Sequence, residues 1–143
     1  MMLKLILDAD GMIAGRLCSF AAKSALEGFQ VEIVNAEKAV VTGPMSRYVQ
    51  RERDRRNRTD PRWGPFTTKM PDRFLRRMVR GMLDYKKLRG KTAFGRVMCH
   101  IGVPLNLAQE KLHPLSVGMS VKKLKHRQFT TIGEICKQFG GSQ

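Results

Sequence analysis

Guanidinium groups recur at helical spacing in residues 70–83 of the chain. They stand at i, i+3, i+4 and i+7, on one side of an expected α-helix: Arg73, Arg76, Arg77 and Arg80. Acidic residues occur only near the ends of this segment, at Asp72 and Asp84, so the four like charges repel one another. A polyanion lying against them would relieve the repulsion, and guanidinium groups suit phosphate because they present paired N–H donors. The pattern indicates a phosphate-binding face, with a solvated basic face as the alternative.

Two further basic stretches flank this segment. Residues 46–58 contain only Tyr48 and Val49 as apolar groups, and a helix there would carry a stripe formed by Arg47, Arg51, Arg55 and Arg58. Core burial cannot hold so polar a helix, so it is either exposed or stabilised by what it binds. After residue 85, a loop broken by Gly90 carries Lys86, Lys87, Arg89 and Lys91. A loop of this composition can follow a phosphate backbone closely.

The overall charge indicates a negatively charged partner. The chain has 143 residues, with 27 Lys and Arg against 12 Asp and Glu, and a formal net charge of +15. Nucleic acid is the commonest partner of so basic a protein. A membrane is less favoured, because no apolar run approaches the roughly 20 residues of a spanning helix. Hydrophobic residues make up 42% of the chain, which is enough for a folded core.

Other chemistry finds little support in the sequence. The glycine segment at residues 10–16, Asp-Gly-Met-Ile-Ala-Gly-Arg, is not G-x-G-x-x-G and lacks a following Gly-Lys-Ser/Thr, so a nucleotide site is weakly indicated. No serine stands in a G-x-S-x-G elbow. The histidines and cysteines share no metal-ligand spacing: His100, His113, His126, Cys18, Cys99 and Cys136. Without a C-x-x-C pair, the cysteines indicate reduced thiols in a cytosolic protein. The expectation is no catalytic residue, no metal and no cofactor.

Hydrophobic patterning supplies the elements that would position the basic residues. A strand at 2–7, a helix at 12–27 capped by Asp10 and ended by Gly28, and a strand at 31–35 predict a right-handed βαβ unit. Later segments read as a short apolar piece at 39–41, a loop at 59–69, a helical turn at 91–96, a strand at 97–102 and an irregular excursion at 103–121. A capping box, Thr131 with Glu134, begins a short final helix.

The helix expected at 70–83 has an apolar face opposite its arginines. Pro71 suits its first turn, and the predicted core-facing side chains are Phe74, Leu75, Met78, Val79, Met82 and Leu83. The loop before it has two large apolar residues, Trp63 and Phe66. They either pin the loop to the body or stack on nucleic-acid bases, and burial is the commoner fate of large aromatics.

Three motifs, in this order, resemble the family of the thirteenth protein of the large ribosomal subunit. Residues 8–17, Asp-Ala-Asp-Gly-Met-Ile-Ala-Gly-Arg-Leu, look like the family's "D-A-x-x-x-x-x-G-R-L" start. Residues 34–43 are similar to its "V-N-A-x-K-x-x-x-T-G" segment, and Val-Arg-Gly-Met-Leu at 79–83 to its "V-[KR]-G-M-L-P", with Asp84 in place of proline. The arginine-rich insert at 46–62 and residues 72–77 look like the archaeal and eukaryotic branch.

The resemblance implies an α/β fold, a three-layer α/β/α domain with a small, mostly parallel four-stranded sheet. We expect one domain over residues 1–143, with a basic helical insert at about 44–69 and a C-terminal extension at about 103–143. The implied role is structural and not enzymatic: binding and stabilising large-subunit ribosomal RNA through its phosphate backbone, beside neighbouring ribosomal proteins in the cytoplasm. No membrane and no small-molecule substrate are expected. The alternatives are a small nucleotide-dependent enzyme on a Rossmann-like sheet and a free nucleic-acid-binding regulator.

The candidate RNA-binding residues combine the basic stretches with two arginines from the family-like segments. Arg16 lies in the first motif, and Arg62 lies in the insert. The full set is Arg16, Arg47, Arg51, Arg55, Arg58, Arg62, Arg73, Arg76, Arg77, Arg80, Lys86, Lys87, Arg89 and Lys91.

Overall fold

A parallel βαβ unit begins the fold, as predicted. The computed structural model describes residues 3–113, 119–124 and 128–141. Strand β1 (Lys4–Asp8) leads into helix α1 (Ala14–Glu27) and returns in β2 (Gln30–Val34). β2 pairs in parallel with β1, from Lys4↔Gln30 to Asp8↔Val34, and with β4 (Val97–Cys99), from Val31↔Val97 to Ile33↔Cys99. The strand order is β1-β2-β4.

The sheet differs from the four-stranded arrangement that the resemblance implied. Strand β3 (Val40–Thr42) does not join the parallel sheet but pairs antiparallel with β5 (Phe129–Thr131) in a separate two-stranded sheet. Directly after β2, Asn35 adopts a left-handed conformation with φ of 56°, and a 3₁₀ helix, η1 (Ala36–Lys38), follows. This turn carries the chain away from the parallel sheet before β3 begins.

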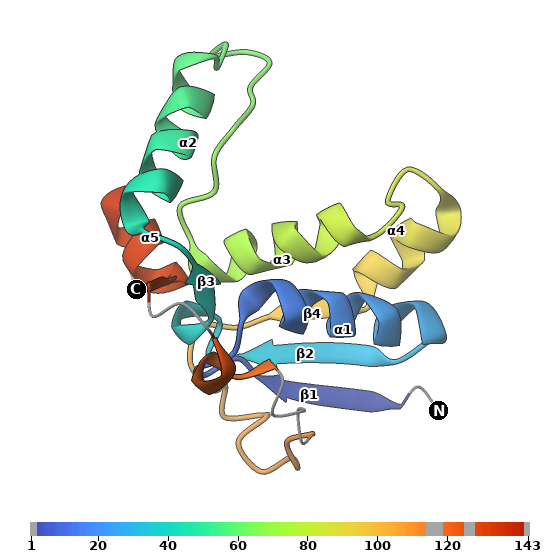
Figure 1. Ribbon diagram of the computed structural model, residues 1–143. Coiled ribbons are helices and arrows are strands. Elements are labelled where there is room, and N and C mark those ends of the chain that lie inside the picture. Colours follow the sequence, from blue (N-terminus) through green and yellow to red (C-terminus); the bar gives the residue numbers. More distant parts are fainter. Residues whose placement is uncertain (1–2, 114–118, 125–127, 142–143) are drawn as a thin grey trace.

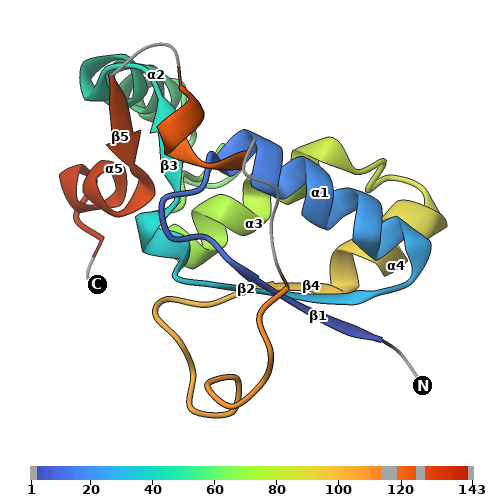
Figure 2. The same ribbon diagram turned by 60° about the horizontal axis from the view of Figure 1, so that its bottom comes forward.

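Helices cover one face of the parallel sheet. Helices α1, α3 (Pro71–Met82) and α4 (Leu88–Gly95) lie on the same side of β1, β2 and β4 (Figure 1). The other face is crossed by the irregular chain that follows β4, which forms the loop below the sheet in Figure 2. Its Leu107 is buried with Ile6 and Val34. The described chain therefore has a loop where the expected three-layer arrangement has a second helical layer.

The termini of α1 show which local signals decide the helix boundaries. Gly28 ends the helix with φ of 107°, as predicted from the presence of a glycine at this position. The expected cap by Asp10 is wrong, because the helix begins at Ala14 and Ile13 is its N-cap residue. The Asp10 amide instead donates to the carboxylate of Asp8, 3.0 Å away, within the turn after β1.

Two helices lie toward the end of the molecule where the short antiparallel sheet is found. Helix α2 (Met45–Asn57) stands out from the sheet and its helices in Figure 1, and α5 (Ile132–Gln138) lies beside its base. The capping box of α5 is present, since Thr131 accepts from the Glu134 amide and Glu134 accepts from the Thr131 amide. A 3₁₀ helix, η3 (Val121–Lys123), precedes β5.

Candidate nucleic-acid interface

Helix α3 carries an apolar face and an arginine face, as the spacing predicted. Leu75 and Val79 are fully buried, and Leu83 is nearly so. The buried stripe is narrower than expected, because Phe74 and Met78 are only half-buried and Met82 is 42% exposed. Pro71 occupies the first turn. On the arginine face, Arg73 is exposed and the other three side chains are half-buried.

Arg76 is attached to the parallel sheet. Its Nε–H donates to the carbonyl oxygen of Val97 in β4, 3.0 Å away. Its guanidinium carbon also lies 4.6 Å from the centroid of the Phe94 ring on α4, in a cation–π contact. The guanidinium group is therefore fixed by two other elements, although the sequence pattern alone presented it as a solvent-facing charge.

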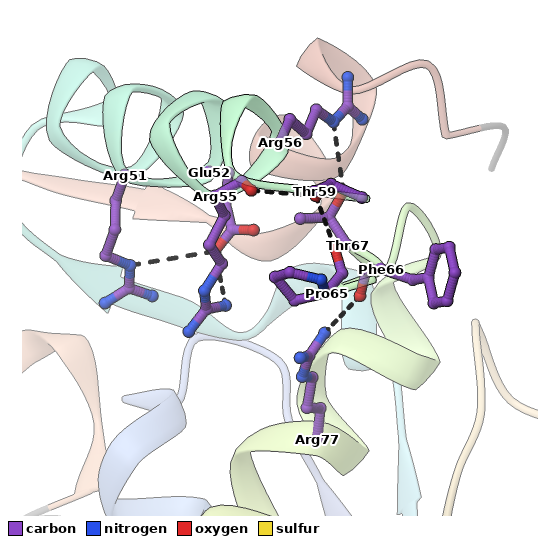
Figure 3. Close-up of polar contacts among 9 residues, drawn as sticks. All are labelled: Arg51, Glu52, Arg55, Arg56, Thr59, Pro65, Phe66, Thr67 and Arg77. Atoms are coloured by element: carbon purple, nitrogen blue, oxygen red, sulfur yellow. Dashed lines mark hydrogen bonds and ion pairs between the residues drawn. The ribbon is translucent and has the colours of Figure 1, made fainter. Parts of the chain in front are cut away.

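Arg77 is attached to the loop that joins α2 to α3. Its Nη1 donates to the carbonyl oxygen of Phe66 at 2.8 Å, as the dashed line from Arg77 shows in Figure 3. Its helical neighbour Arg80 lies with its guanidinium carbon 5.0 Å from the ring centroid of Tyr85. The neighbouring residues Arg76 and Arg77 thus reach strand β4 and the loop before α3, respectively.

A buried carboxylate orders the arginines of α2. Glu52 is only 5% exposed, and its Oε1 lies 3.1 Å from Nη1 of Arg55 and 3.9 Å from Nε of Arg51. Figure 3 shows Arg51 and Arg55 extending from α2 toward the side from which Arg77 rises out of α3. The two helices therefore direct guanidinium groups into the same space.

Arg56, which the helical stripe did not include, anchors α2. It donates to the Thr67 hydroxyl at 3.2 Å and to the Phe139 carbonyl oxygen at 3.3 Å. Its guanidinium carbon lies 4.9 Å from the centroid of the Phe139 ring. These partners lie on the following loop and just beyond α5. The spacing of arginines gave no signal for this role, which depends on a residue 83 positions away.

Two adjoining grooves are formed between these elements. The first, here called the arginine groove, has a volume of about 410 Å³ and is lined by Phe66, Thr68, Arg73, Arg76, Arg77, Arg80 and Phe94. The second, of about 350 Å³, lies between α2 and α3 and includes Arg51 and Arg55. Arg77, Arg80 and Thr68 line both. The structure thus brings candidate residues of α2 and α3 together on one surface.

The remaining candidate residues line neither groove. Arg47 on α2, Arg58 at its C-terminal end and Arg62 in the following loop are exposed. Arg16 is exposed on α1. The turn after α3 and the first part of α4 form a separate basic cluster of exposed side chains: Lys86, Lys87, Arg89 and Lys91. In this cluster Lys87 pairs with Asp84, with 2.8 Å between Nζ and Oδ2.

The expectation that Trp63 and Phe66 pin their loop to the body is wrong. Trp63 is 86% exposed and Phe66 is 63% exposed. Polar contacts hold the loop instead. Asp60 and Gly64 exchange backbone hydrogen bonds of 3.1 and 2.9 Å, and the Thr59 hydroxyl donates to the Pro65 carbonyl oxygen at 2.8 Å. With its backbone fixed in this way, the loop displays both aromatic rings to solvent.

The cysteines lie in the protein interior as free thiols. Cys18, Cys99 and Cys136 are all buried. Burial raises the pKa of Cys99 to about 12 and that of Cys136 to about 11, and it also raises the pKa of Cys18. Among the described residues, no group of three or more His, Cys, Asp or Glu side chains could hold a metal ion. His126 lies outside the described residues.

None of the helices in the described ranges is both long and apolar enough to cross a membrane.

Comparison with known proteins supplies the family. The family model of ribosomal protein L13 matches residues 3–106.

Proteins named "Large ribosomal subunit protein uL13" are similar over nearly their whole length. The one from Methanocaldococcus jannaschii is 40% identical over 140 residues, covering 94% of this chain and 96% of that protein. The Methanococcoides burtonii protein is 38% identical over 135 residues, with the same coverage. The Haloarcula marismortui protein is 38% identical over 138 residues, covering 96% of this chain and 92% of that protein. The chain therefore belongs to the ribosomal protein L13 family, as the three sequence motifs predicted, and to its archaeal-type branch, in keeping with the insert at 46–62 and residues 72–77.

Proposed function

We propose that this chain is a structural constituent of the large ribosomal subunit in the cytoplasm, where it binds and stabilises large-subunit ribosomal RNA beside neighbouring ribosomal proteins. The observation that carries the proposal is the shared surface of α2 and α3, where Arg51, Arg55, Arg77 and Arg80 line one groove. The similar archaeal proteins bear the name of a large-subunit protein over nearly the full chain, which supports the same role.

The arginine groove suits phosphate because its donors are already oriented. Arg76 and Arg77 each use one N–H on a backbone carbonyl, and a guanidinium group has five. The remaining N–H groups are held near fixed positions, so less side-chain freedom is lost when a phosphate binds. Phosphate contacts of this kind position RNA by the course of its backbone and carry no base sequence.

The separate basic cluster after α3 would contact a second stretch of RNA. Lys86, Lys87, Arg89 and Lys91 are exposed at the end of α3 remote from α2. A rigid helix with cations at both ends can hold two RNA segments at a fixed separation. We infer that residues 1–143 act as one such clamp, with the insert at about 44–69 and the extension from about 103 adding contacts.

The proposed role is not enzymatic. The acidic side chains where a Rossmann-like enzyme would bind a nucleotide support this. Phosphates bind beyond the carboxyl ends of parallel strands in such enzymes. Here the Asp8 carboxylate at the end of β1 accepts from the Asn35 side chain at 2.9 Å. The nearby groove has three carboxylates and two lysines, an unfavourable balance for phosphate: Asp10, Glu37, Glu134, Lys38 and Lys137.

A salt titration tests the proposal. Binding to a large-subunit RNA fragment is measured for the wild type, Arg73→Ala and Arg80→Ala, with Lys23→Ala on α1 as an exposed-charge control. Each lost phosphate contact should flatten the plot of log affinity against log salt by somewhat under one unit. Arg80→Lys should lose less than Arg80→Ala, because it keeps the charge but not the planar fork.

Two results would contradict the proposal. One is an unchanged salt dependence in both arginine variants. The other is failure of the protein to sediment with large subunits through high salt, which would favour a free nucleic-acid-binding regulator.

A further inference from the structure

The arginine groove has aromatic walls as well as cationic ones. Phe66 reaches it from the loop before α3, with 63% of its surface exposed. Phe94 reaches it from α4, half-buried beneath the guanidinium group of Arg76. A site that met only the outside of an RNA backbone would not need an exposed phenyl ring within it. The volume, about 410 Å³, falls in the range of roughly 300–1,000 Å³ typical of sites for small molecules.

We propose that the arginine groove holds one unstacked nucleotide of RNA. Its base would stack on the Phe66 ring and on the Arg76–Phe94 pair, since unpaired bases stack on aromatic rings and guanidinium planes. Its phosphate would lie among Arg73, Arg77 and Arg80. This inference rests on the proposed function, because it takes RNA as the partner, and it goes beyond backbone contact to a defined binding pocket.

The walls of this pocket are held in place by contacts that do not use the Phe66 ring itself. The Phe66 carbonyl oxygen accepts from Arg77 at 2.8 Å, and in Figure 3 the ring projects away from Pro65 at the edge of the loop. Gly64 leaves room for it, since a Cβ there would lie 3.1 Å from a carbon of the Phe66 ring. Replacing the ring should therefore leave the loop backbone in position.

Charge and shape favour a nucleotide over other occupants. The groove's lining in the described chain has four arginines and no acidic side chain, so an anion is required. The exposed Phe66 ring and the Arg76 guanidinium group over Phe94 add a requirement for a flat group next to that anion. An RNA nucleotide meets both requirements, whereas an acidic peptide meets only the first.

The test compares single-stranded with double-stranded RNA. A 5′-labelled uridine hexanucleotide and a short RNA duplex are titrated with the wild type and with Phe66→Leu, which keeps apolar bulk without the aromatic face. We expect Phe66→Leu to weaken hexanucleotide binding about tenfold, as for loss of one stacking partner, and to leave duplex binding within twofold. Phe66→Trp should retain the affinity.

Phe129→Leu is the matched control. Phe129 is 47% exposed on β5 and lies outside the arginine groove, so this variant should change neither affinity. Photocrosslinking with 4-thiouridine in the hexanucleotide should label the peptide containing Phe66 in the wild type and not in Phe66→Leu. A thermal melt of each variant confirms that folding is unchanged.

The outcomes separate this inference from the proposed function. Equal losses for hexanucleotide and duplex, or no loss for either, would overturn the nucleotide pocket and leave backbone binding intact. Competition by a hexaglutamate peptide as strong as that by unlabelled hexanucleotide would also overturn it. If neither RNA binds in a salt-dependent way and the large-subunit RNA fragment also fails to bind, both proposals are wrong.

Discussion

The Nε–H of Arg76 donates a hydrogen bond to the carbonyl oxygen of Val97, 3.0 Å away, and thereby joins the arginine face of α3 to strand β4. β4 stands at one end of the order β1-β2-β4, and it contains only residues 97–99. A residue that suits phosphate binding by its position in the sequence therefore also holds a short outer strand.

Substitutions of Arg76 and Arg73 should have different effects on the free energy of unfolding. Arg76→Ala removes a hydrogen bond from a charged donor and should lower the free energy of unfolding by about 1 kcal/mol, the modest value expected because the side chain is only half-buried. Arg73→Ala, at an exposed position of the same helix, should leave stability unchanged. Urea denaturation of both variants measures the difference, and equal stabilities would show that the Arg76 contact contributes nothing.

The apolar face of α3 should show a gradient of stability effects. Leu75 is fully buried, so Leu75→Ala should cost about 2–5 kcal/mol in unfolding free energy. Met78 is half-buried, so Met78→Ala should cost less, although the helical periodicity alone places both residues on the core face. Thermal melts rank the two variants. A larger loss for Met78→Ala would contradict the burial pattern.

Alkaline pH should destabilise the protein through its buried thiols. Burial raises the pKa of Cys99 from its ordinary value of 9.0 to about 12. Above pH 9 the unfolded chain loses this proton while the folded chain keeps it, so unfolding becomes more favourable as pH rises toward 12. The wild type should therefore lose stability with rising pH more steeply than Cys99→Ala. Denaturation curves recorded below and above pH 9 give the change of unfolding free energy with pH for the wild type and for Cys99→Ala. Equal changes in the two proteins would exclude a contribution from Cys99.

Helix α2 should exchange its amide hydrogens quickly in the free protein and slowly on RNA. Its one buried residue is Glu52, so little apolar burial offsets the loss of conformational freedom. Hydrogen exchange of residues 51–57, with and without a large-subunit RNA fragment, measures the change. Strong protection in the free protein would contradict the expectation.

In the protein without RNA, Arg56 should be the arginine that stabilises α2. Arg56→Ala removes its contacts with Thr67 and Phe139, so exchange across α2 should become faster still. Arg53→Ala, an exposed substitution one turn earlier, is the control and should leave exchange unchanged. Similar acceleration by both variants would indicate that helix propensity, and not the Arg56 contacts, holds α2.

Local signals account for the elements that the sequence predicted well. Pro71 in the first turn of α3, Gly28 after α1 and the Thr131–Glu134 capping box act within a few residues of their own positions, and all three are present. The parallel pairing of β1 and β2 likewise follows from a strand, helix and strand in direct succession.

The features that differed from the sequence-based predictions depend on residues distant in the sequence. β3 pairs with β5 across about ninety residues of chain, and helical spacing cannot reveal that Arg76 and Arg77 reach backbone carbonyls on other segments. The exposed aromatics were missed for a related reason. The usual burial of large aromatic residues favoured Trp63 and Phe66 as anchors, whereas hydrogen bonds of Thr59, Asp60 and Gly64 within the loop fix its backbone without them.

The exposed position of Trp63 determines what intrinsic fluorescence can report. It is the chain's single tryptophan, and 86% of its surface meets solvent in the folded protein. Its emission should change little on unfolding, so circular dichroism is the better probe of stability. The same emission should be quenched when a base stacks on the ring or an RNA strand covers the loop. The folded protein thus contains an internal optical sensor, whose signal should report occupancy of the loop that follows α2.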